Sequence, residues 1–381
     1  MTDVQSRLSR RVLRASGLLA AFGVCVLTIG GSAFRAAPQG QTRAFLIDEA
    51  DQGFLYAPME QECPQGFDMT VEETFLSQLT PAERERLLRP ENGKELASKW
   101  KGEFMRGPGG ENICNNPKSF MKDPRHPPYR GTASKIAFGM NLDGTPDGRA
   151  TANTCGHPKF TGVNGEAAVD NQLYRAVGCS KLARSTAPMS KQFLDPFLIE
   201  IRGIDDLKND DHVEVGIYSP EDTPLQGSDG NALPNQTLGV TKNAHWRTTV
   251  SGRIVDGQLT TDVMPVVYMR WILPTWGVLG TQDHEFRDAR FRMSLQPGGT
   301  LKAVLAAYRP IENIYTVGRC CSGTASVANN DCASEHKTLA MMADGYPDPD
   351  TGQCTAVSSA SNLKGVPVFL VHPRAEQSSR K

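Results

Sequence analysis

The sequence has almost no net charge, since 41 basic residues stand against 42 acidic ones in 381 positions. Such a chain lacks the strong positive field that binding to nucleic acid or to an anionic membrane surface requires. The GxSxG, HExxH, GxGxxG and Walker motifs are also absent. Serine esterase, zincin, dinucleotide and nucleotide chemistries therefore lack their usual signatures, and we predict no catalytic residue.

The cysteines show no CxxC, CxxCH or Cys/His zinc spacing, which argues against structural zinc and c-type haem. At the N-terminus, a basic stretch (Arg7–Arg14) precedes the apolar run Ala15–Phe34, and Gly31-Ser32-Ala33 offers small residues for cleavage. We predict a signal peptide over residues 1–33 and a periplasmic or secreted protein that has no membrane span after cleavage. An uncleaved membrane anchor is the alternative, and the paired arginines leave twin-arginine export open.

Cleavage leaves eight cysteines, and an even number in an exported protein indicates disulfides. Closeness along the chain favours Cys63–Cys114, Cys155–Cys179 and two bridges among the last four cysteines. A strained disulfide between the adjacent Cys320 and Cys321 is the alternative for the last group. The predicted disulfide cysteines are Cys63, Cys114, Cys155, Cys179, Cys320, Cys321, Cys332 and Cys354.

Plentiful glycine (36) and proline (25) favour a loop-rich β protein. Apolar and polar residues alternate in Phe197–Ile201, Val213–Ile217 and Ala289–Leu295, as in half-buried strands. Asp256-Gly257 predicts a tight hairpin, and Val263–Ile272 reads as a strand buried on both faces. Strands that are joined by turns predict a mainly β fold, an antiparallel β-sandwich or jelly roll.

The composition divides the chain into four parts. After the signal peptide comes a small N-terminal segment of helices and loops over residues 34–130, with one helix opening at Thr80-Pro81. The sandwich, together with a polar loop region, is predicted over 131–315. Residues 316–381 are predicted to form a cysteine-rich, disulfide-stapled cap that packs on the sandwich.

The stretch from Asn141 to Cys179 is rich in carboxylates, amides and glycine and has almost no apolar periodicity. Such a segment cannot order itself by burying hydrocarbon, which points to disulfides and a bound cation. Its start resembles the calcium loops of thrombospondin type-3 repeats, and the resemblance implies oxygen ligands from Asn141, Asp143 and Asp147 around a turn at Gly144. A solvated turn is the alternative. The predicted calcium ligands are Asn141, Asp143, Asp147, Asn153 and Asp170.

Asp170-Asn171-Gln172 opens a helix that runs to Val177, and we favour Asp170 as its N-cap. Alternatively, these polar side chains complete a cation or glycan site with His157 and Asn153. Without a carboxylate partner, His157 is a structural residue rather than a base. The predicted binding residues are His157, Asn171 and Gln172.

A second Asp-Gly-x-Pro-Asp sequence starts at Asp344 and precedes Cys354, as the first precedes Cys155. We interpret it as a helix C-cap that runs into a proline-rich turn, with a second cation loop as the alternative. The blocks Cys155–Cys179 (C-x-H…V-D-N-Q…G-C) and Ala343–Ala356 resemble a group of exported bacterial proteins to which no activity is assigned. That resemblance implies an exported protein but no function.

These observations predict a calcium-stabilised, non-enzymatic protein that binds a glycan or another envelope component. Trp246, Trp271 and Trp276 are either stacking surfaces for sugars or core residues. The first alternative is a metal-assisted hydrolase or lyase that acts on an envelope polymer. It requires Asp143, Asp147, His157 and Asp170 to converge. The second alternative is a purely structural envelope protein.

Overall fold

The computed structural model describes residues 40–51, 53–55, 57–107, 109–186, 196–275, 278–319 and 331–373. The predicted signal peptide, the Cys320–Cys321 pair and Trp276 lie outside these residues, as does the side chain of Trp271. Within the described part of the chain, no helix is both long and apolar enough to cross a membrane.

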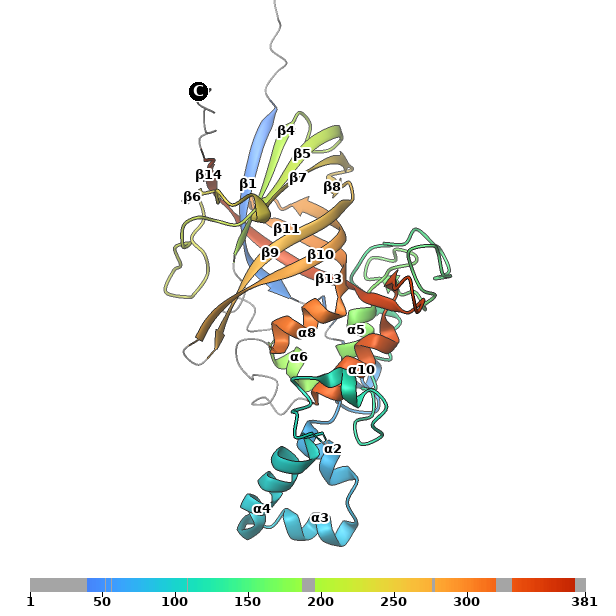
Figure 1. Cartoon of the computed structure of the whole chain (residues 1–381). Helices are drawn as coiled ribbons and strands as arrows, with labels where there is room; N and C mark the ends of the chain where they lie inside the picture. Colours follow the sequence, from blue (N-terminus) through green and yellow to red (C-terminus); the bar gives the residue numbers. More distant parts are fainter. Residues whose placement is uncertain are drawn as a thin grey trace, which may run out of the picture. The chain divides into compact units, whose positions relative to one another are not determined.

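Eight antiparallel strands of the described chain close into a barrel (Figure 1). The order around the barrel is β1, β4, β5, β7, β8, β10, β11 and β13, and β13 pairs back onto β1. The chain is mainly β, as predicted, but the predicted sandwich or jelly roll is wrong because a single sheet closes on itself. In the same order the strands are Gln41–Asp51, Phe197–Ile204, Asp210–Tyr218, Arg247–Val255, Gln258–Thr261, Val278–Leu295, Leu301–Pro310 and Cys354–Pro367.

Two strands that close the barrel come from the ends of the chain. β1 lies in the segment 34–130, where helices and loops were expected, and β13 lies in the region where the cysteine-rich cap was expected. Their register sets Phe45 opposite Pro367 and Ile47 opposite Gly365. Alternation within one strand shows which face is buried, but it does not show which distant strand will be its neighbour.

The remaining strands extend or flank the barrel. β9 pairs with β10, β12 pairs with β13, and β14 and β6 form a small parallel pair, as do β2 and β3. These strands are β2 (Ile136–Ala137), β3 (Thr161–Gly162), β6 (Thr237–Gly239), β9 (Met264–Thr275), β12 (Gly345–Pro347) and β14 (Phe369–Val371).

Helices α5, α8 and α10 contact the barrel through β13, and α8 also contacts β10 and β11. Asp331 caps α10 by accepting from the Ser334 N–H, and it also pairs with the fully buried His126 at 2.9 Å. The helices are α1 (Met59–Glu62), α2 (Val71–Ser77), α3 (Pro81–Leu87), η1 (Pro90–Asn92), α4 (Gly93–Ala97), η2 (Ser98–Phe104), η3 (Pro117–Phe120), α5 (Gln172–Val177), α6 (Lys181–Thr186), η5 (Ala244–Trp246), α8 (Ile311–Arg319) and α10 (Cys332–Met342).

Alternate side chains of the barrel strands form one buried apolar cluster, which includes Ile199, Val215 and Phe291. The alternation that was predicted for the strands of Val215 and Phe291 is therefore confirmed, but the half-buried pattern is wrong for Phe197–Ile201, where Leu198 and Glu200 on the other face are buried as well. The hairpin at Asp256-Gly257 is also confirmed, since it joins β7 to β8 and both residues have positive φ, at 50° and 77°.

The expectation of a strand buried on both faces is wrong for β9. Met264 and Val267 are buried, whereas Val266 between them is 40% exposed. The strand is amphipathic, and its mostly apolar composition hid that pattern because valine occupies both faces.

A buried histidine of β10 predicts a dependence of stability on pH. His284 accepts a hydrogen bond from Arg309 of β11 at 2.8 Å, and burial, followed by the charge of Arg309, lowers its pKa well below the usual value. Because the unfolded chain takes up this proton first, near pH 6.5, the His284 contribution is complete above that pH and is lost as the pH falls. In urea unfolding between pH 7 and 5, His284→Gln is expected to lose less stability than the wild type. Equal losses in the two proteins would contradict this.

Three disulfides join six cysteines of the described chain: Cys63–Cys179, Cys114–Cys332 and Cys155–Cys354. Disulfide bonding of these six cysteines is thus confirmed. The pairing by closeness is wrong, because Cys63 does not join Cys114 and Cys155 does not join Cys179. Each bridge spans 116 to 218 residues, so the pairing follows from the fold rather than from local sequence.

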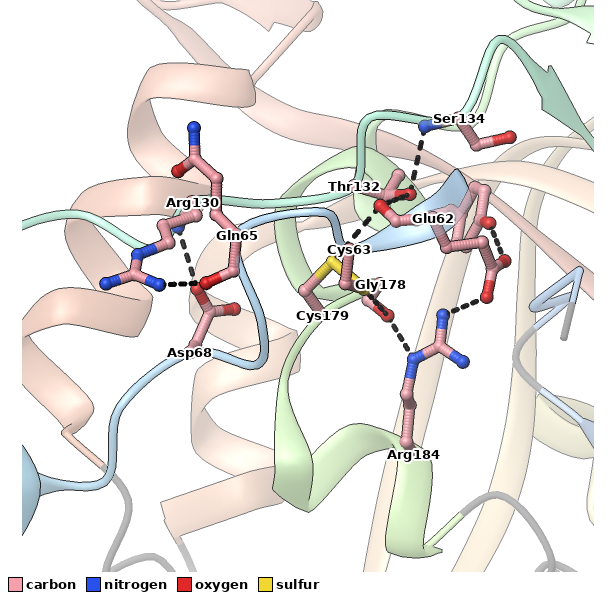
Figure 2. Close-up of a disulfide and its surroundings, with 11 residues drawn as sticks. Glu62, Cys63, Gln65, Asp68, Arg130, Thr132, Ser134, Gly178, Cys179 and Arg184 are labelled. Atoms are coloured by element: carbon pink, nitrogen blue, oxygen red, sulfur yellow. Dashed lines mark hydrogen bonds and ion pairs between the residues drawn. A yellow bond between two sulfur atoms is a disulfide. The ribbon is translucent and has the colours of Figure 1, made fainter. Parts of the chain in front are cut away.

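Figure 2 shows the Cys63–Cys179 disulfide beside a buried ion pair. The guanidinium of Arg184 donates to the Glu62 carboxylate and to the Gly178 carbonyl. It therefore joins the same two segments that the disulfide joins. Thr132 also donates to the Glu62 carbonyl at 2.9 Å. The disulfide and the ion pair together hold the end of α1 against the C-terminal end of α5, and the hydrogen bond joins the end of α1 to the segment of Thr132.

Candidate cation site

The polar segment that begins at Asn141 lies against the outer wall of the barrel. Arg290 of β10 donates to the carbonyls of Asn141 and Leu142 at 2.9 and 3.0 Å. Leu142 packs in a small buried cluster with Tyr308 of β11 and Ala356 of β13. The outward faces of these strands are therefore buried here as well, and the segment places its polar side chains next to the barrel wall.

Five charged or titratable side chains converge there: Asp143, His157, Lys159, Asp170 and Asp344, which we call the polar cluster. The Lys159 ammonium lies 2.5 Å from Asp143 Oδ1 and 2.6 Å from Asp170 Oδ1. His157 Nε2 lies 2.7 Å from Asp170 Oδ1 and 3.4 Å from Asp344 Oδ2. The three aspartate side chains are fully buried, and those of His157 and Lys159 are at most 7% exposed.

Backbone contacts hold Asp170 and bring the two loop segments together. The Leu142 N–H donates to Asp170 Oδ2 at 2.7 Å, and the Asp170 N–H donates to the Met140 carbonyl at 3.0 Å. The favoured interpretation of Asp170 as a helix N-cap is wrong. Asn171 caps α5 by accepting from the Tyr174 N–H, which leaves the Asp170 carboxylate free to face the polar cluster.

His157 is oriented by its other ring nitrogen. Nδ1 lies 3.0 Å from the Cys155 carbonyl, to which it donates, so Nε2 faces the carboxylates. Burial disfavours the charged ring, but the Asp170 hydrogen bond and the charge of Asp344 outweigh burial and raise the pKa of His157. The backbone of Gly148 lies against the backbone of His157, and a Cβ at Gly148 would meet the His157 carbonyl oxygen at 1.9 Å. Gly148 also has a positive φ of +72°. Only glycine fits this position.

Asp344 and Tyr308 add polar atoms that are buried without a hydrogen bond. Asp344 Oδ1 accepts from the Ser358 N–H at 2.7 Å, whereas Oδ2 accepts no hydrogen bond. Burial raises the pKa of Asp344 to about 6, although His157 opposes this. The Tyr308 hydroxyl is also without a hydrogen bond, and burial, followed by the charge of Asp344, raises its pKa. A buried polar atom without a partner costs free energy, so these two atoms are available to bind a further polar group or ion.

The structure brings together some of the predicted calcium ligands but not all of them. Asp143 and Asp170 meet in the polar cluster, and Asn141 Oδ1 lies at its edge, 3.5 Å from the Lys159 ammonium. Asp147 is 59% exposed and points to Arg149. Asn153 is exposed, and its carbonyl pairs with the Tyr346 N–H. Asp147 is thus not part of the group of donors that Asp143, His157 and Asp170 form, and the described contact of Asn153 is made by its backbone.

Asn171 and Gln172, which were predicted to bind a ligand, have structural contacts. The Asn171 amide donates to the Phe138 carbonyl at 3.0 Å, and the Gln172 amide donates to the Pro158 carbonyl at 2.9 Å. Both side chains are buried. They hold the loops around the polar cluster and do not face its centre, whereas His157 does face it.

The arrangement offers a cation three donors from separate loop positions. One ligand atom each from Asp143, His157 and Asp170 lie within 4.8 Å of one another. The lysine ammonium is bound to the same two carboxylates that a metal ion would use. A single cluster thus contains both the donor set and an internal cation.

Sequence reasoning missed Lys159, Asp344 and Tyr308. The one available signal was the repeated Asp-Gly-x-Pro-Asp sequence before Cys155 and before Cys354, since those two cysteines are bonded to each other. The repeat therefore brings Asp143 and Asp344 to the same place in the fold. Nothing comparable marks Lys159 or Tyr308.

Comparison with known protein families, curated proteins and solved structures found no match. The resemblance to exported bacterial proteins and to thrombospondin calcium loops therefore stays a prediction. Any function has to be argued from the geometry of the barrel and of the polar cluster.

Proposed function

We propose that this protein is an exported, disulfide-bonded barrel protein that binds a divalent cation at the polar cluster and recognises a glycan or another envelope component without catalysing a reaction. The convergence of Asp143, His157 and Asp170 carries the proposal. Asp344 Oδ2, which is buried without a hydrogen bond beside them, supports it. Three long-range disulfides support a periplasmic or secreted location.

The charge of the cluster favours a cation. The carboxylates of Asp143 and Asp170 offer buried oxygens within 4.8 Å of each other, and Asp344 Oδ2 lies 3.4 Å from His157. Buried charges of one sign need compensation by cations or protons. Lys159 supplies one positive charge to two of them. A divalent ion would supply two positive charges in place of those of Lys159 and of the His157 proton, and it would also give Asp344 Oδ2 a partner.

An aromatic surface next to β9 supports the glycan part of the proposal. His245 of η5 stacks on Tyr268 of β9 with ring centroids 4.2 Å apart. The Trp246 indole donates to Asp283 at 2.7 Å, and His245 lies 2.8 Å from the same carboxylate. Partly exposed rings beside a carboxylate suit the apolar faces and hydroxyl groups of a sugar.

Chelation tests the cation. We expect the purified mature protein to contain a divalent metal by elemental analysis and its melting temperature to fall by about 5 °C with chelator, since an ion at a hundred times its Kd contributes about 2.7 kcal/mol. Asp143→Asn should abolish this fall. Asp147→Asn, a change in the same loop at an exposed position, should retain it. A melting curve that chelator leaves unchanged would remove the cation from the proposal.

The alternative of a metal-assisted hydrolase or lyase is favoured by one observation. Asp344 Oδ2 accepts no hydrogen bond and lies 3.4 Å from His157 Nε2. A carboxylate and an imidazole at this distance could act as a proton-transfer pair. Release of reducing ends from an envelope polysaccharide by the metal-loaded protein would favour the enzyme. Binding of the same polymer without turnover would favour the binding protein.

A further inference from the structure

We infer that the ion of the polar cluster is a transition-metal ion of the zinc or manganese type rather than calcium, ligated by His157 Nε2 and the carboxylates of Asp143, Asp170 and Asp344, and that Lys159 replaces it when it is absent. The inference rests on the proposed function, because it names the ion at the same site. It differs from the calcium site expected from the sequence in both the ion and the ligands.

The orientation of His157 is the first argument. A histidine that ligates a metal usually donates its second ring N–H to a carbonyl or carboxylate, which directs the other nitrogen at the ion. His157 has this arrangement, with Nδ1 on the Cys155 carbonyl and Nε2 between the carboxylates of Asp170 and Asp344. Imidazole suits zinc and other transition metals, whereas calcium takes oxygen ligands.

Asp344 is the second, independent argument. Its side chain is fully buried, and Oδ2 accepts no hydrogen bond although it points at His157. The Tyr308 hydroxyl, buried in the same region, has no hydrogen-bond partner either. Within the described residues the cluster thus has unused polar atoms next to a nitrogen and two further carboxylates, as expected where a ligand is missing.

Lys159 gives the cluster an internal counter-ion, which is the third argument. Its ammonium bridges Asp143 and Asp170, and two positive groups cannot share these oxygens at such short range. The lysine side chain is long and flexible, so the ammonium can leave the two carboxylates when an ion binds. Metal binding and the Lys159 ion pairs are therefore mutually exclusive.

Lys159→Met tests this inference in the oxidised mature protein, because methionine keeps most of the stem and removes the charge. Titration calorimetry with zinc, manganese and calcium chloride, each alone, measures the affinities. We expect zinc or manganese to bind the wild type more tightly than calcium does. We expect Lys159→Met to bind the same ion at least about tenfold more tightly than the wild type does. Lys302→Met, which removes an exposed lysine of β11, should bind like the wild type.

The outcomes separate the inference from the proposed function. Absence of binding by all three ions to the wild type and to Lys159→Met overturns both. Tighter binding of calcium, or unchanged affinity in Lys159→Met, overturns the inference and leaves the cation site. If Lys159→Met melts early without metal, recovery of the melting temperature by zinc or manganese supports the inference. A Lys159→Met protein that neither ion restores shows that the lysine is structural, and overturns the inference.

Discussion

Replacing Asp170 by alanine is expected to lower the free energy of unfolding by about 3–5 kcal/mol, as is typical when one partner of a buried ion pair is removed. The Asp170 carboxylate accepts from Lys159, from the Leu142 N–H and from the His157 ring, all in a buried setting. Its loss leaves the Leu142 amide without its partner and leaves Asp143 as the one carboxylate of the described residues that still pairs with the Lys159 ammonium. Equilibrium unfolding in urea measures the change.

The matched control is Asp147→Ala, which removes a carboxylate from the same loop at an exposed position. It should alter stability by no more than about 0.5 kcal/mol. If the two variants were equally stable, the polar cluster would not hold the loop to the barrel wall. Binding of the metal should be lost in Asp170→Ala and kept in Asp147→Ala.

Replacing both Cys155 and Cys354 by serine is expected to cost about 2–4 kcal/mol, since the bridge restricts a long loop of the unfolded chain. It joins residues 199 positions apart, and the Cys155 carbonyl orients His157. We therefore expect weaker metal binding together with a lower melting temperature. Calorimetry and thermal melting measure the two effects.

The comparison is the double variant Cys63→Ser and Cys179→Ser, which removes the bridge at the C-terminal end of α5, where the two cysteines contact Gly178 and Glu62. That variant should melt earlier but bind the ion with unchanged affinity. An equal loss of affinity in both variants would mean that the disulfides act on the cluster only through overall stability.

Part of the candidate site could be predicted from the sequence. The dense carboxylates and amides after Asn141 indicated a polar site, and Asp143, His157 and Asp170 do converge. They lie within 28 residues of one another and are joined by contacts such as Leu142 N–H to Asp170. Asp344 was not predicted as a ligand because its approach depends on the pairing of β12 with β13 and on a disulfide from another part of the chain.

Individual strands and turns followed from local pattern, because the period of two in Phe197–Ile201 and the Asp256-Gly257 turn are properties of neighbouring residues. Barrel closure, the cysteine partners and the place of Lys159 among the carboxylates were decided only in the folded chain. Closure needs Phe45 beside Pro367, and the Cys114–Cys332 bridge spans 218 residues. Contacts of that range depend on how whole strands pack, and a short stretch of sequence carries no information about its distant partner.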